Sequence, residues 1–95
     1  MDHNSHSFGD AMKAIIKSPG IRKNYLRVIA KMTWEEKMGS LIVSHTKRMS
    51  LRKGVLSVKV DSDALRHELL YHREMIKKMM NDSFGEPIID EVKIL

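Results

Sequence analysis

The chain has 95 residues, of which 42% are hydrophobic and 31% are charged, and its formal net charge is +5. This length accommodates one domain, and this balance is typical of a globular chain rather than a disordered one. No apolar run is longer than three residues and there is no cysteine, which excludes a transmembrane helix, a disulfide and a thiolate zinc site. The N-terminal sequence MDHNSHSFGD has neither the basic nor the apolar region of a secretory signal, so we expect a soluble cytoplasmic protein.

The positive charge is concentrated in the first half of the chain. Between Lys13 and Lys53 there are eleven Lys or Arg and two Glu, a net charge of +9, whereas residues 54–95 carry −2 and residues 1–12 carry −2. Such asymmetry is typical of a protein that presents one basic surface to a polyanion. The alternative is a set of solvated helix faces that bind no partner.

We expect residues 1–7 to form a disordered tail and residues 8–95 to form one domain, because the tail is polar and lacks periodicity. Helical periodicity begins at Phe8 and ends at the helix-breaking sequence Ser18-Pro19-Gly20. A second helix is predicted over residues 21–32. Its apolar face would consist of Ile21, Tyr25, Val28, Ile29 and Met32.

A third helix is predicted over residues 33–45. Thr33 and Glu36 have the spacing of a capping box, in which the Thr33 side chain begins the helix and the Glu36 carboxylate reaches back to it. For Trp34 we favour packing in the core over stacking on an exposed base. The inward side chains of this helix would be Trp34, Met38, Leu41 and Ile42.

The periodicity then changes to that of strands. Residues 48–52 and 55–60 alternate between polar and apolar side chains, and Gly54 lies between them, which predicts a hairpin. A long amphipathic helix is predicted over residues 63–81, with its N-cap in Asp61-Ser62-Asp63, and residues 88–95 predict a last strand. The fold class is therefore α+β: a two-layer sandwich with N-terminal helices, a β-hairpin, a long helix and a final strand in a three-stranded mixed sheet.

The residues do not assemble a catalytic, cofactor or metal site. The sequence has no phosphate-binding loop and no nucleophile with a base partner, so we expect a protein that is not an enzyme and uses no cofactor or small-molecule substrate. His67 and His72 are five residues apart, on different faces of a helix, which argues against a shared metal ion. His72 lies on the apolar face of the long helix, and we expect it to be hydrogen-bonded and partly buried.

The basic residues are the candidate functional residues. They form two groups, one on the second helix and one on the first strand and its turn. Lys and Arg without neighbouring aromatic residues indicate contact with a sugar–phosphate backbone rather than with bases. The candidate nucleic-acid-binding residues are Arg22, Lys23, Arg27, Lys31, Lys47, Arg48, Arg52 and Lys53.

Several short motifs, taken in order, resemble the DciA-like family of bacterial proteins. Trp34 is followed by Gly39 and by Ser44-His45-Thr46, and the hairpin sequence LRKGVLSVKV is followed by Asp61-Ser62. The helix sequence ALRHELLYHREMIKKMMNDSFG and the closing Ile89-Asp90-Glu91-Val92 complete the resemblance, which covers about residues 10–95.

The resemblance implies a non-enzymatic DNA-replication accessory that engages the replicative helicase, assists its loading and binds single-stranded or forked DNA. It also implies a fold similar to a K-homology domain, although this sequence has no G-x-x-G loop, with which those domains hold a nucleic-acid backbone. The alternative is an RNA- or ribosome-associated nucleic-acid-binding module that uses the same basic surface. No membrane partner is expected.

Overall fold

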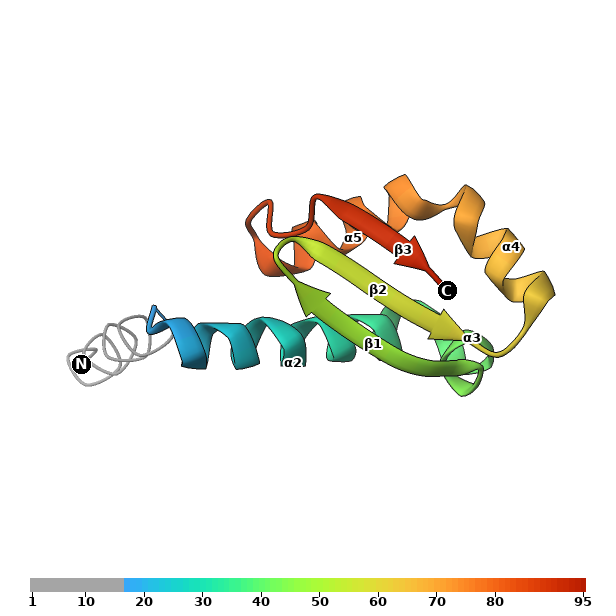
Figure 1. The fold of residues 1–95 in the computed structure, drawn as a ribbon, viewed down its shortest axis with the longest axis horizontal. Coiled ribbons are helices and arrows are strands. Elements are labelled where there is room, and N and C mark those ends of the chain that lie inside the picture. Colours follow the sequence, from blue (N-terminus) through green and yellow to red (C-terminus); the bar gives the residue numbers. More distant parts are fainter. Residues whose placement is uncertain (1–16) are drawn as a thin grey trace, which may run out of the picture.

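The computed structural model describes residues 17–95, which form four helices and three strands (Figure 1). In chain order these are α2 (Pro19–Lys37), α3 (Gly39–Ser44), β1 (Thr46–Arg52), β2 (Val55–Val60), α4 (Asp63–Tyr71), α5 (Arg73–Phe84) and β3 (Glu91–Ile94). The predicted α+β class is confirmed. The tail expected over residues 1–7 and the helix expected from Phe8 lie outside the described residues.

The three strands form a mixed sheet, as predicted, and β2 lies in its centre. β1 and β2 pair antiparallel, and β2 and β3 pair parallel. The hairpin turn has a positive φ at both Lys53 (50°) and Gly54 (79°), a backbone that matches the twist of a two-residue hairpin. A Cβ atom at Gly54 would lie 2.5 Å from a carboxylate oxygen of Asp90, whose N–H donates to the Gly54 carbonyl at 2.8 Å. Asp90 therefore packs on the turn as part of a loop, and the last strand begins only at Glu91.

The helices and the sheet form two layers. In Figure 1 the helices lie behind the sheet, and within the described residues nothing covers its front face. The strands alternate accordingly: Leu56, Val58 and Val60 of β2 are buried against the helices, whereas Lys59 is exposed on the open face. The largest fully buried side chains are Trp34, Leu56, Met80, Ile89 and Val58.

The capping box predicted at Thr33 is wrong, because α2 continues through this position to Lys37. Thr33 is buried within the helix, beside Trp34, and both pack on the core side. The helix ends instead where Gly39 adopts a φ of +86° and the Met38 N–H donates to the Trp34 carbonyl at 3.0 Å. One long helix followed by the short α3 replaces the two helices predicted over residues 21–32 and 33–45.

The apolar face predicted for the second helix is also largely wrong. The structure instead turns Leu26, Ala30, Thr33 and Trp34 towards the core. These side chains lie on the opposite side of α2, because Ala30 and Trp34 are two residues, or about half a helical turn, beyond Val28 and Met32. Leu41 of α3, predicted to point inward, is 70% exposed, whereas Met38 and Ile42 pack on the core as predicted. Of the predicted apolar face, Ile29 is half-buried, and the members that are exposed are Ile21, Tyr25, Val28 and Met32.

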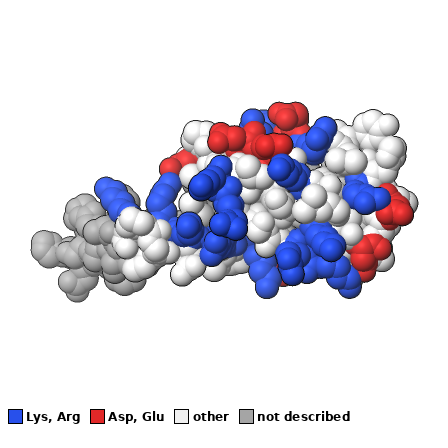
Figure 2. All heavy atoms as spheres, in the orientation of Figure 1, with Lys and Arg blue, Asp and Glu red and all other residues white. Residues whose placement is uncertain are grey.

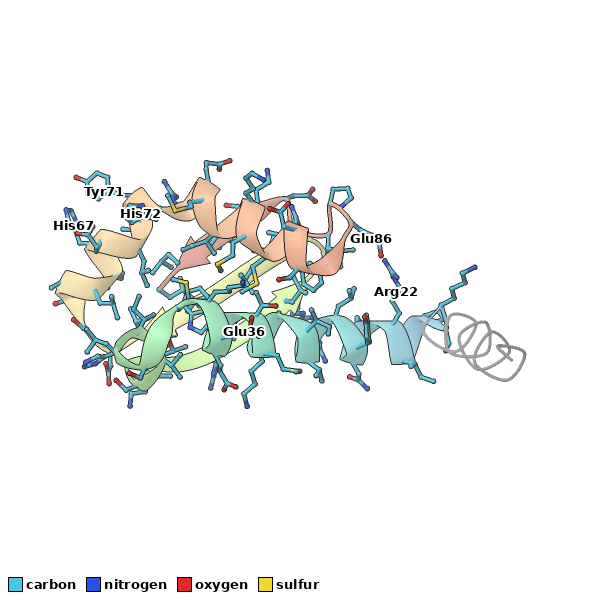
Figure 3. All side chains as sticks on the ribbon, turned by 180° about the vertical axis from the view of Figure 1, so that it is seen from behind. Arg22, Glu36, His67, Tyr71, His72 and Glu86 are labelled. Carbon is cyan, nitrogen blue, oxygen red and sulfur yellow. The ribbon has the colours of Figure 1, made fainter. Side chains whose placement is uncertain are left out.

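The long helix predicted over residues 63–81 is divided at His72, where φ is −107° and ψ is 19°. Its N-cap is confirmed, since Ser62 Oγ accepts a hydrogen bond from the Leu65 N–H at 3.2 Å. The break lets α4 pack on β2 and β3 while α5 packs on β3 and α2. His72 is exposed at this break, with Nε2 3.5 Å from Glu68, so the prediction of a partly buried histidine is wrong (Figure 3).

Candidate nucleic-acid interface

A β-bulge decides which basic side chains of β1 reach the open face of the sheet. Thr46 pairs with Val60 and Arg48 pairs with Lys59, so Lys47 is an extra residue that shifts the register. From Arg48 onward, alternate residues point away from the helices. Arg48 and Arg52 therefore lie on the open face, and Met49 and Leu51 pack on the core side.

A groove between α2 and the edge strand β1 brings together two of the predicted basic groups. Arg27 and Lys31 line it from the helix, together with the carboxylate-bearing Glu35, and Lys47 and Arg48 line it from the strand, so four cations outnumber one acid. Its volume is about 570 Å³. These four side chains are up to 21 positions apart in the sequence, from Arg27 to Arg48, and the packing of α2 on β1 makes them neighbours.

A second, smaller hollow of about 220 Å³ lies at the hairpin turn, where Arg22 and Lys23 of α2 meet Lys53. Arg22 forms an ion pair with an acidic residue. Its guanidinium donates to Glu86 Oε1 at 3.0 Å, and Figure 3 shows the two side chains pointing at each other. This ion pair ties the N-terminal part of α2 to the loop before β3. It also neutralises the charge of Arg22, one of the residues predicted to bind nucleic acid.

Lys47 is the other predicted residue with an acidic partner. Asp61 accepts hydrogen bonds from His45 Nδ1 at 2.7 Å and from Lys47 Nζ at 3.1 Å. The hydrogen bond from His45, and then that from Lys47, lower the pKa of Asp61 below its ordinary value. The Asp61 N–H also donates to the His45 carbonyl at 3.0 Å, so this cluster joins the end of α3 to the end of β2.

Two basic residues of the open face were missed by the sequence-based prediction. Lys59 lies directly opposite Arg48 on β2, and Lys93 lies beside Ser57 on β3. Both alternate with buried apolar residues, and this alternation is the signal by which they could have been found.

The charged side chains of the sheet face are unevenly distributed. Figure 2 shows Lys and Arg gathered over β1 and the adjoining part of α2, and Asp and Glu both towards the start of β3, the strand that begins at Glu91, and at the end of the molecule where β2 leads into α4. Within residues 17–95, no carboxylate forms a salt bridge with the remaining cations of this surface. These cations, which we call the β1 basic surface, are Arg27, Lys31, Arg48, Arg52, Lys53 and Lys59.

Among the described residues that line the groove, none has an exposed aromatic ring. Trp34 is only 1% exposed, and its Nε1 donates to Thr46 Oγ1 at 3.0 Å, so the prediction that Trp34 packs in the core is confirmed. The surface therefore offers point charges and guanidinium groups, which recognise phosphates, and offers no ring on which a base could stack.

Within residues 17–95, His, Asp and Glu side chains form no cluster of three or more that could hold a metal ion. None of the helices in this part of the chain combines the length and apolarity needed to cross a membrane. The fold and the surface thus define a class: a small α+β protein with a cationic sheet face and a cationic groove beside its edge strand.

The chain belongs to the DciA family, because the family model described as "Dna[CI] antecedent, DciA" matches residues 7–94. This family is associated with the replicative helicase DnaB and is not known as a family of enzymes. No curated protein and no solved structure matches this chain significantly. The similarity to K-homology domains stays a prediction.

Proposed function

We propose that this protein is a non-enzymatic replication accessory that binds the sugar–phosphate backbone of single-stranded or forked DNA and engages the replicative helicase to assist its loading. The β1 basic surface would hold the DNA. Membership of the DciA family supports the connection with the helicase and favours DNA over RNA as the nucleic acid. No residue is assigned to the helicase contact.

The observation that carries the DNA-binding part is the convergence of cations around one strand. Arg48 and Lys59 are cross-strand neighbours on the open face, and Arg27 and Lys31 line the groove on the other side of Arg48. Arg48 and Arg52 are four residues apart, or about 13 Å along β1. A nucleic-acid strand that follows β1 would therefore meet cations along its whole length, which favours backbone contacts independent of sequence.

Charge reversal tests this surface. We expect the double variant Arg48→Glu/Arg52→Glu to bind single-stranded DNA roughly ten times more weakly or worse at low salt, and to do so for all base sequences alike. Both side chains are exposed, so the fold should be retained, as circular dichroism would verify. The matched control is Lys78→Glu on α5, an exposed cation on the helical layer whose reversal should leave the affinity nearly unchanged. Equal affinity of the Arg48/Arg52 variant and the wild type would refute the assignment.

The helicase part is tested by size-exclusion chromatography of the full chain with the replicative helicase of its own organism, with and without single-stranded DNA. Co-elution supports the accessory function. If the helicase elutes separately while DNA still binds, the protein is a nucleic-acid-binding protein without this partner. Stronger binding to structured RNA than to single-stranded DNA at the same salt concentration would favour the RNA-associated alternative.

A further inference from the structure

The hollow beside the hairpin turn has an apolar floor that backbone contacts with DNA would leave unused. Leu26 of α2, Leu51 of β1 and Ile88 of the loop before β3 line it, together with Pro19 at the start of α2. Leu51 is buried, and Leu26 and Ile88 are half-buried, so the floor is the edge of the core. A phosphate group is held by charge and hydrogen bonds and needs no such floor.

The rim of the same hollow is cationic. Arg22 and Lys23 of α2 and Lys53 of the hairpin turn line it, and no carboxylate does. Lys23 and Lys53 form no salt bridge within residues 17–95. Of the acids nearby, Glu86 is bonded to Arg22, and Asp90 packs on the hairpin turn. An apolar floor inside a cationic rim fits a ligand that is apolar and flanked by negative charge.

The hollow lies at one end of the β1 basic surface. Lys53 belongs to both, and Arg52 precedes it on the open face of the sheet. A DNA strand that follows β1 would therefore bring its phosphates to the rim and its bases close to the floor. The volume of about 220 Å³ is below the roughly 300–1,000 Å³ of pockets for drug-sized ligands, so it suits a small group such as one base.

Arg22 adds a planar group to this hollow. Its guanidinium donates to Glu86 at 3.0 Å, which holds it at the rim, and its side chain is 34% exposed. Guanidinium planes stack on the bases of single strands, a contact that a lysine ammonium cannot make. The ion pair weakens Arg22 as a phosphate ligand and leaves it suited to contact with a base.

We propose that this hollow receives one unpaired base of the bound DNA strand, with the base on Leu26, Leu51 and Ile88 and its flanking phosphates on Lys23 and Lys53. The inference rests on the proposed function, since the strand has to lie along β1. It adds a selection that backbone contacts alone do not make. A base in a duplex must first be unstacked and unpaired, whereas a base of a single strand is free to enter. The hollow would therefore favour single-stranded DNA without reading its sequence.

An apolar side chain of a partner protein is the other group of this size that fits the floor. Such a side chain has negative charge beside it only if its own neighbours happen to be acidic. Every internal base of a DNA strand has a phosphate on each side, so a base accounts for the floor and for Lys23 and Lys53 together.

The test compares two single strands of about ten nucleotides that carry the same charge, one with thymine at every position and one with an abasic site at every position. Fluorescence anisotropy measures the binding of each to the full chain at the same salt concentration. Backbone contact alone predicts equal affinities. We expect the thymine strand to bind about tenfold more tightly, because the stacking of one base contributes a factor of about this size.

Methyl NMR of the full chain locates the bases. We expect the methyl signals of Leu26, Leu51 and Ile88 to shift with the thymine strand and to stay unchanged with the abasic strand. The internal control is Val55, which pairs with Arg52 on the open face and should respond to both strands.

The double variant Arg22→Lys/Ile88→Ala removes the guanidinium plane and part of the floor but keeps the charge. We expect its affinity for the thymine strand to fall to that for the abasic strand. The matched control is Arg66→Lys/Leu41→Ala, since Arg66 is ion-paired with Asp63 on α4 and Leu41 is exposed on α3. Both lie at the far end of the molecule from the hairpin turn (Figure 1), so this variant should bind both strands like the wild type.

If Ile88→Ala prevents folding, Arg22→Lys alone still tests the inference, because it too should weaken binding of the thymine strand only. Equal binding of the two strands by the wild type, or methyl signals that the thymine strand does not shift, overturns the inference and leaves the proposed function intact. If neither strand binds, the proposed function fails and the inference fails with it.

The other occupants of the hollow are distinguished by the same methyl signals. Shifts of Leu26, Leu51 and Ile88 with the replicative helicase and not with DNA would assign the hollow to a partner protein. Nuclear Overhauser contacts between these methyl groups and residues 1–16 in the free protein would assign it to the chain's own N-terminal segment. Either result overturns the inference.

Discussion

The indole of Trp34 connects the helical layer to the sheet through one threonine. Its N–H donates to Thr46 Oγ1 at 3.0 Å, and the same hydroxyl donates to the Ile42 carbonyl at 2.8 Å. A hydroxyl can accept and donate at once, so Thr46 satisfies a buried indole and the end of α3 together. These two hydrogen bonds hold the buried side chain of Trp34 beside the basic groove.

The substitution Thr46→Val should therefore destabilise the protein by about 1–3 kcal/mol, because it leaves the buried indole N–H without an acceptor. Urea unfolding followed by the fluorescence of Trp34, the only tryptophan, measures the free energy of unfolding. Thr46→Ser retains the hydroxyl and is expected to cost much less. If valine is tolerated as well as serine, the hydrogen bond contributes little to stability.

The contacts of Asp61 predict that the stability of the fold depends on pH. Hydrogen bonds from His45 and then Lys47 lower its pKa below the ordinary value of 3.8, so the folded state favours the ionised carboxylate. A lowered folded pKa gives stability that is present above the unfolded value and is lost as the pH falls through the folded pKa. Asp61→Asn should therefore unfold more easily than the wild type at neutral pH, and the difference should vanish in acid well below 3.8. Denaturant unfolding of both proteins at several pH values measures this difference, and a constant difference down to acid pH would contradict the assignment.

At the scale of elements, α2 shows why periodicity alone chose the wrong side of a helix. Ile21, Val28 and Met32 form one apolar row, and Leu26, Ala30 and Trp34 form another on the opposite side. Both rows satisfy helical spacing, so the pattern predicts a helix without stating which row is inside. Contact with β1 and α5 decides it, because the wide Trp34 fills the core while the small Ala30 allows close approach.

The boundary between α2 and α3 depends on Gly39. Its φ of +86° lies in the left-handed region, and no atom within 4 Å would meet an added Cβ. The cost of Gly39→Ala should therefore come from the backbone alone, about 1–2 kcal/mol of stability. Gly39→Asn should cost less, because asparagine tolerates this conformation better. Thermal or urea unfolding compares the two variants, and a neutral alanine would show that this φ is not required.

At the scale of the whole molecule, the net charge of +5 does not describe how the charge is distributed over the sheet face. Cations gather over β1 and α2, and carboxylates lie towards the start of β3 and where β2 leads into α4 (Figure 2). Such a distribution would favour a polyanion that lies over β1 and between these acidic groups. It also predicts that association with DNA weakens with salt.

The salt dependence can be stated as a number. If about four phosphates of a single strand are contacted, the plot of log affinity against log salt concentration should have a slope near −3. Neutralising two contacts with Arg48→Gln/Arg52→Gln should reduce the magnitude of the slope by about 1.4, since each contact contributes about 0.7. Fluorescence titrations at several salt concentrations measure both slopes. An unchanged slope would mean that these arginines do not contact phosphates.

The candidate site was only partly visible in the sequence. The charge distribution and strand alternation pointed to Arg48 and Arg52, and the same alternation contains Lys59, which was not counted. The partners of Arg22 and Lys47 were not visible, because Glu86 and Asp61 are 64 and 14 residues away and reach them only through tertiary packing. The basic groove is likewise a product of packing, since it needs α2 and β1 side by side.

The sequence by itself determined the order of helical, hairpin, helical and strand segments and the turn at Gly54, because these depend on local backbone preference and short-range alternation. The mixed three-stranded sheet followed from the rule for a strand that returns after a helical connection. The tertiary structure decided the rest: the unbroken course of α2 through Thr33, the break at His72 and the packing of Leu26 and Ala30, beside Trp34, in place of the Ile21–Met32 row. These features depend on which surfaces meet. Burying a large side chain such as Trp34 contributes more free energy than a local cap at Thr33 could, so long-range packing overrode the local signal.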